Sequence, residues 1–101
     1  MNLFENIDEI NANENNLNFE SFKSFSNLTK LMLACNNIKT IRLKHEEFSK
    51  LETLDLSFNS LSPNDVAHLG ILKNLKVLKL TGNNLTHLPD TFSKLYVFSK
   101  E

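Results

Sequence analysis

The chain is poor in the residues that most metal-binding and nucleotide-binding motifs require. It has one cysteine, two glycines, two prolines and no tryptophan in 101 residues. A lone cysteine, Cys35, can form neither an internal disulfide nor a paired-cysteine metal site, which favours a reducing, intracellular compartment. The phosphate-binding motifs GxxxxGKS/T and GxGxxG need several glycines at fixed spacing, and Gly70 and Gly82 cannot supply them. These counts argue against both classes of site.

Excess charge and long hydrophobic runs are absent as well. The formal net charge is −1, so the chain lacks the basic footprint by which proteins bind nucleic acids. No window approaches the roughly 18 consecutive apolar residues of a membrane-spanning helix. Residues 1–10 are acidic and contain no hydrophobic run, so we expect no secretory signal there. We expect a cytoplasmic protein, with the cilium or axoneme and the nucleus as alternative locations.

The sequence is organised around one stretch, LETLDLSFNSL, which runs from Leu51 to Leu61. Leucines occupy its first, fourth, sixth and eleventh positions, and Asn59 occupies the ninth. This spacing does not fit an amphipathic helix, whereas Leu54 and Leu56, two residues apart, would point to the same side of a short strand. A single segment of this kind cannot bury its own apolar face, so the stretch predicts that similar segments stack on it.

Three further segments fill the same five positions. They hold Leu28, Leu31, Leu33, Asn36 and Ile38; Leu75, Leu78, Leu80, Asn83 and Leu85; and, in a weaker form, Ile7, Ile10, Ala12, Asn15 and Leu17. The frames start at residues 7, 28, 51 and 75, and a partial frame begins near Leu95 with Phe98 at its fourth position. The pattern resembles the leucine-rich repeat family, whose units of about 20–29 residues share the consensus LxxLxLxxNxL.

The resemblance implies an α/β fold. In a leucine-rich repeat solenoid, short strands form a curved parallel sheet on the concave side, and short helices, 3-10 turns and loops form the convex side. We expect residues 1–101 to form one such domain, with the leucines in a shared core and the four asparagines in a ladder that bonds the adjoining turns. The fourth unit would expose Leu78, Leu80 and Leu88 along its outer edge. We therefore expect a longer array or a partner that covers this edge.

Two of the segments between frames are rich in phenylalanine. Phe19, Phe22 and Phe25 follow one another at steps of three, which fits a tight helical or 3-10 turn with the rings packed inward. Residues 44–50 look like one solvated helical turn in which Phe48 fills the core. Both segments are predicted to lie on the convex side.

The third unit carries the clearest helix signal of the chain. Ser62 suits the N-cap, Pro63 the first helical position and Asp65 the first turn. Gly70 would end this helix. In the fourth unit, Pro89 disfavours a regular helix and predicts a more extended convex segment.

Candidate binding residues follow from the expected architecture. Positions two, three, five, seven and eight of each unit would line the concave surface. The residues predicted to contact a partner there are Lys30, Met32, Cys35, Thr53, Asp55, Phe58, Val77 and Lys79. Met32, Cys35 and Phe58 would form a small apolar patch among polar neighbours, which suits a protein partner. Two alternatives stay open: the face is merely solvated, or the Phe58 ring packs on the turn of the next unit.

The sequence shows no catalytic or metal-binding arrangement. His45, His68 and His87 fall in three different units, and no nucleophile has a base and an orienting group at short range. We therefore predict no enzymatic activity, no cofactor and no metal site. The family resemblance implies a non-enzymatic module that binds a protein partner. The alternatives are a structural component of a large assembly such as a ciliary axoneme, and an adaptor or regulatory subunit of a phosphatase or ubiquitin ligase.

Overall fold

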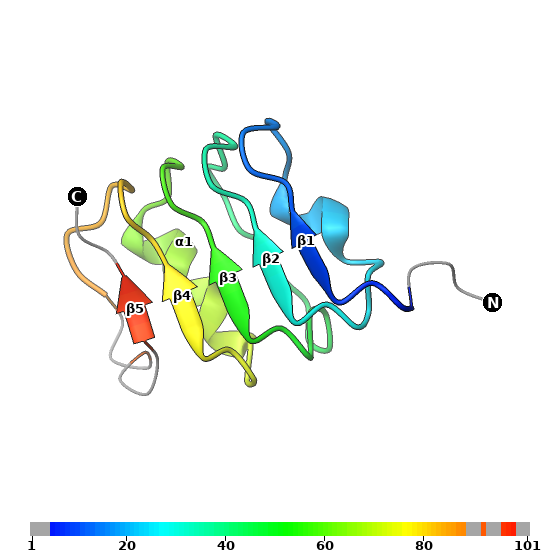
Figure 1. The fold of residues 1–101 in the computed structure, drawn as a ribbon. Helices are drawn as coiled ribbons and strands as arrows, with labels where there is room; N and C mark the ends of the chain where they lie inside the picture. The colour runs from blue at the N-terminus through cyan, green and yellow to red at the C-terminus, as the bar shows by residue number, and fades with distance from the viewer. Residues whose placement is uncertain (1–4, 89–91, 93–95, 99–101) are drawn as a thin grey trace.

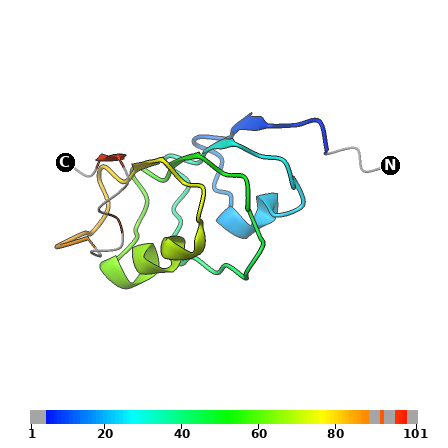
Figure 2. The same cartoon turned by 90° about the horizontal axis from the view of Figure 1, so that it is seen from below.

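Five short parallel strands form one sheet in the computed structural model, which describes residues 5–88, 92 and 96–98 (Figure 1). The strands lie side by side in chain order: β1 (Glu9–Asn11), β2 (Lys30–Met32), β3 (Thr53–Asp55), β4 (Val77–Lys79) and β5 (Tyr96–Phe98). Parallel neighbours cannot be joined by a tight hairpin, so the chain returns behind the sheet between one strand and the next. Successive returns on the same side build the predicted coil, with the helices opposite the sheet (Figure 2).

The register of the strands follows the repeat, so that equivalent positions of adjacent units are paired. Leu31 is the register partner of Leu54, and Leu54 is the partner of Leu78. The leucines at positions four and six of these three units are all fully buried: Leu31, Leu33, Leu54, Leu56, Leu78 and Leu80. Burying one leucine side chain stabilises a fold by about 1.5–3 kcal/mol. The core shared between adjacent units is therefore the main source of stability, as the spacing predicted.

The fourth unit differs from the prediction at its outer edge. Leu78 and Leu80 are 0% exposed and Leu88 is half-buried, so the expected apolar edge does not exist there. The reason is that β5 pairs with β4 and Phe92 is buried in the same core. The register also shifts the fifth frame by one residue: Val97, rather than Phe98, is the partner of Leu78. The predicted frame at Leu95 was therefore wrong by one position.

Phenylalanines pack the first two units together on the convex side. The 3-10 helix η1 (Phe19–Phe22) buries Phe19 and Phe22, which confirms the tight turn expected there. The Phe19 ring stacks on Phe48 of the second unit with the ring centroids 4.5 Å apart. Residues 44–50 form turns rather than the predicted helical turn, because Glu46 (φ 76°) and Phe48 (φ 54°) adopt left-handed backbone. Phe48 nevertheless fills the core as predicted.

The third unit carries the α-helix α1 (Pro63–Ala67) and, directly after it, the 3-10 helix η2 (His68–Ile71). Ser62 caps α1, as the sequence predicted, and it also forms a reciprocal capping box with Asp65. Gly70 lies inside η2 and does not end the helical segment, so that part of the prediction was wrong. The segment expected to be extended at Pro89 lies outside the described residues.

Three buried asparagines link adjacent units through their amides. Asn36, Asn59 and Asn83 are 3%, 8% and 7% exposed. The Asn59 Oδ1 atom accepts hydrogen bonds from the backbone N–H groups of Asn36 and Ile38 in the preceding unit. Asn15 was predicted to join this ladder, but it is exposed and its amide donates only to the carbonyl of Asn13. The first unit is thus bonded to the second through the side chains of Asn36 and Asn13, and not through the side chain of Asn15.

Candidate functional site

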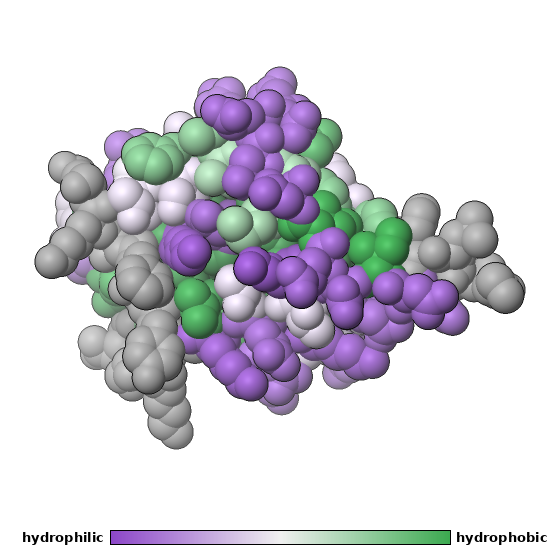
Figure 3. Space-filling model, in the orientation of Figure 1, coloured by the Kyte–Doolittle hydropathy of each residue, from purple (hydrophilic) through white to green (hydrophobic). Residues whose placement is uncertain are grey.

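The sheet face opposite the helices carries two parallel rows of side chains. Position three contributes Glu9, Lys30, Thr53 and Val77, and position five contributes Asn11, Met32, Asp55 and Lys79, each residue paired in register with the next. Adjacent parallel strands lie about 4.8 Å apart, so neighbours within a row are close enough to touch one ligand. Six of the eight predicted binding residues stand in these rows. Hydrophilic side chains cover most of this face, with more apolar ones between them (Figure 3).

The face is hollowed where β1 meets β2. A cavity of about 290 Å³ there is lined by Glu9, Ile10, Asn11, Lys30 and Met32. Its lining combines an acid, a base and apolar groups, which is the composition of a polar protein-binding surface with an apolar centre. Lys30 and Met32 were predicted as binding residues, whereas the contribution of the first unit was not.

Asp55 is less available than its position in the sheet suggests. Its side chain is 9% exposed, and its Oδ1 atom accepts a hydrogen bond of 2.9 Å from the backbone N–H of Ser57. Asn11 makes the same bond to the N–H of Asn13 in the first unit. The carboxylate therefore fixes the backbone where β3 ends. Lys79 is its register partner, but the two side chains form no ion pair.

Cys35 and Phe58 lie apart from these rows, on the loops that follow β2 and β3. The N–H of Cys35 donates to the carbonyl of Ser57, so the two loops run side by side. Position eight has a positive φ in all four units: Glu14 61°, Cys35 59°, Phe58 54° and Gly82 76°. In sequence, only the glycine signals this left-handed position, and the other three side chains give no hint of it.

Phe58 packs on the turn of the next unit, as one of the alternatives proposed. Its side chain is 59% exposed, and yet its ring packs on Gly82 of the next unit: a Cβ atom at residue 82 would lie 2.4 Å from the Phe58 Cδ1 atom. The ring is thus held by the following loop while much of its surface faces solvent. An aromatic ring positioned in this way suits contact with another protein.

The described residues contain no group of three or more His, Cys, Asp or Glu side chains that could hold a metal ion. Within the same residues, no helix is both long and apolar enough to cross a bilayer. Cys35 is a free, exposed thiol. What this surface offers is therefore polar contacts, two adjacent rows of side chains and one exposed aromatic ring.

Comparisons with known proteins agree with the repeat geometry. The sequence model described as Leucine rich repeat matches residues 49–96. Mouse X-ray radiation resistance-associated protein 1 is 50% identical over 86 residues, which cover 85% of this chain and 11% of that protein. The adenylate cyclase of Schizosaccharomyces pombe is 33% identical over 107 aligned residues, which cover 81% of this chain and 6% of the cyclase. The chain therefore spans about a ninth or less of the length of these relatives.

Proposed function

Because the chain belongs to the leucine-rich repeat family, we propose that it is a protein-interaction module whose sheet face binds a protein partner. Domains of this family generally mediate protein–protein interactions. The observation that carries the proposal is the pair of side-chain rows on β1–β4, which stand in register on the face opposite the described helices.

The chemistry of this face supports a partner that is itself a folded protein. Met32, Val77 and Phe58 supply apolar contacts, while Lys30 and Lys79 supply charge without an ion pair inside the described chain. In protein interfaces, a few apolar or aromatic side chains contribute most of the affinity, and surrounding polar groups exclude water and set the orientation. The proposed contact residues remain Lys30, Met32, Cys35, Thr53, Asp55, Phe58, Val77 and Lys79.

The test compares charge variants on the two sides of the molecule. Proteins captured on the intact chain are identified by cross-linking and mass spectrometry, and the capture is repeated with a Lys30→Glu, Lys79→Glu double variant. Lys73→Glu serves as the matched control, because Lys73 is exposed and lies outside the sheet face. We expect the sheet-face variant to lose its specific partner and the control to retain it. Equal capture by both variants would overturn the sheet-face proposal.

The same experiment separates the alternative roles. Cross-links to cytoskeletal or ciliary polymers would indicate a structural component, and cross-links to a phosphatase catalytic subunit or a ligase core would indicate an adaptor. We also propose a cytoplasmic location, which the lone, exposed Cys35 supports because it forms no disulfide. Imaging of the tagged full-length protein distinguishes the cytoplasm from the cilium and the nucleus.

A further inference from the structure

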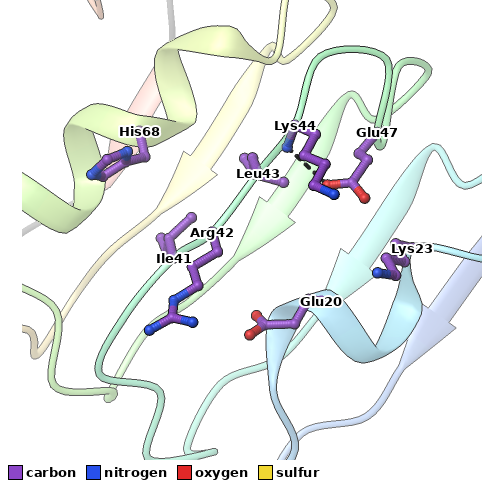
Figure 4. A pocket seen from close by; sticks show the side chains of 8 residues that line it. All are labelled: Glu20, Lys23, Ile41, Arg42, Leu43, Lys44, Glu47 and His68. Carbon is purple, nitrogen blue, oxygen red and sulfur yellow. Dashed lines mark hydrogen bonds between the residues drawn. The ribbon is translucent and has the colours of Figure 1, made fainter.

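A second hollow, of about 460 Å³, lies on the convex side and draws its lining from three consecutive units (Figure 4). The side chains of Glu20 and Lys23 enter it from η1 and the turn that follows, and His68 enters it from the start of η2. Its floor is the segment 41–44 of the second unit. Because this groove lies on the opposite side from the sheet face, it can act independently of the function proposed above.

The groove exists because the second unit has no convex helix. The first unit has η1 there and the third has α1 followed by η2, whereas residues 39–43 form neither helix nor strand. Thr40 and Ile41 are β-branched, and β-branched side chains lose rotamer freedom in a helix. The segment therefore runs as an extended trace between two helical neighbours (Figure 4), and the hollow lies along it.

The floor resembles a strand without a partner. Burial alternates along it: Ile41 is 3% exposed and Leu43 is half-buried, whereas Thr40, Arg42 and Lys44 are exposed. No backbone N–H or C=O group of residues 39–43 makes a hydrogen bond to another part of the chain that the structure describes. An extended segment with free backbone donors and acceptors is a template on which a second extended segment can pair.

The charged side chains around the groove indicate which kind of segment would pair with residues 39–43. Lys23, Arg42 and Lys44 surround the groove, and none of them forms an ion pair, since the ion pair found in the described residues joins Lys76 and Glu52. The Glu47 carboxylate already accepts a 2.8 Å hydrogen bond from the backbone N–H of Lys44. With Glu20 and Glu47 in the same lining, the three cations leave one positive charge in excess, which favours a ligand that carries carboxylates.

We propose that this groove binds an acidic peptide segment in extended conformation. The segment pairs with the backbone of residues 39–43 as an added strand and places its carboxylates beside Lys23, Arg42 and Lys44. Apolar side chains on its other face rest against the half-buried Leu43. Main-chain pairing supplies affinity in this mode of recognition, and the side-chain contacts supply the preference for acidic sequences.

The probe is the labelled peptide Glu-Val-Glu-Ile-Glu-Val-Glu, with Lys-Val-Lys-Ile-Lys-Val-Lys as its charge-inverted counterpart, and binding to the whole chain is followed by fluorescence anisotropy. We expect the acidic peptide to bind and the basic one not to bind. Reversing two of the surrounding cations, in an Arg42→Glu, Lys44→Glu double variant, should weaken binding by about tenfold. The matched Lys30→Glu, Lys79→Glu variant on the sheet face should leave the affinity unchanged, and thermal melts verify that both variants fold.

Backbone pairing has its own readout. On addition of the acidic peptide, amide hydrogen exchange should slow at residues 39–43, and N-methylation of alternate peptide amides should abolish binding in one register and spare it in the other. The proposal is overturned if neither peptide binds, if the basic peptide binds equally well, or if the sheet-face variant loses the peptide. It is also overturned if binding leaves the amides of residues 39–43 unprotected. The two proposals concern opposite faces of the molecule and are tested with different variants. Failure of the groove proposal can therefore be distinguished from failure of the sheet-face proposal.

Discussion

The ring of Phe58 packs on Gly82 of the next repeat unit, where a Cβ atom would lie 2.4 Å from the Phe58 Cδ1 atom. Gly82 also has a φ of +76°. Close approach and left-handed backbone both favour glycine at this position. The contact connects the fold to the proposed interface, because the loop of the fourth unit holds the exposed aromatic ring of the third.

Gly82→Ala is expected to lower the free energy of unfolding by about 1–2 kcal/mol, since an L-residue is disfavoured in left-handed backbone. The Phe58 ring is 59% exposed and can swing aside, so backbone strain rather than collision sets the cost. Urea denaturation measures the change. Gly70→Ala is the matched control: Gly70 lies in η2 without a positive φ, and its substitution should change stability by less than about 0.5 kcal/mol. Equal losses at the two glycines would contradict this account.

The asparagine ladder predicts a second contrast. Asn59 is buried and its side chain makes five hydrogen bonds, two as acceptor and three as donor. Asn59→Ala leaves the N–H groups of Asn36 and Ile38 and the carbonyl of Leu33 without these bonds, and it should destabilise the fold by about 1–3 kcal/mol. Asn15→Ala removes one exposed hydrogen bond and should cost less than about 0.5 kcal/mol. Thermal melts of the two variants that coincide would count against the ladder as a stabilising element.

The repeat spacing was sufficient to predict most of the fold. Residues two apart within each frame mark strands, and the weak frame that starts at Ile7 contains strand β1 even though its unit is poor in leucine. Burial of Leu31, Leu54 and Leu78 followed from the same spacing. These features were predictable because they depend on local periodicity, which each unit repeats.

Other features depend on contacts between units, and the sequence does not show them. The register of β5 is set by pairing with β4, so the leucine at position 95 suggested the wrong frame. Left-handed backbone at Cys35 and Phe58 is imposed by the loop geometry, although neither residue type favours it. The convex groove arises only because neighbouring units differ in their return segments. Six of the predicted site residues were placed together on the sheet face, but the burial of Asp55 could not be anticipated.

Two substitutions of Asp55 separate the contribution of its hydrogen-bond acceptor to stability from the contribution of its charge. Asp55→Asn keeps an oxygen that can accept from the Ser57 N–H, as Asn11 does for Asn13 in the first unit. It should therefore leave stability within about 0.5 kcal/mol of the parent, whereas Asp55→Ala should cost about 1 kcal/mol through the lost hydrogen bond. Chemical denaturation tests this difference. If Asp55→Asn destabilises as much as Asp55→Ala, the charge itself is required for folding and not only the acceptor.

The capping box of α1 yields a last prediction, which connects local structure to the convex groove. The Ser62 backbone N–H and hydroxyl lie 3.0 and 2.8 Å from the Asp65 Oδ2 atom. Ser62→Ala removes one half of the box and should lower the free energy of unfolding by about 1 kcal/mol. Ser60→Ala, an exposed serine two residues earlier, should leave stability unchanged. Since α1 leads directly into η2, which carries His68 at the groove, fraying of α1 should also weaken binding of the acidic peptide. A variant that loses stability but retains full peptide affinity would show that the groove depends on its floor and not on this wall.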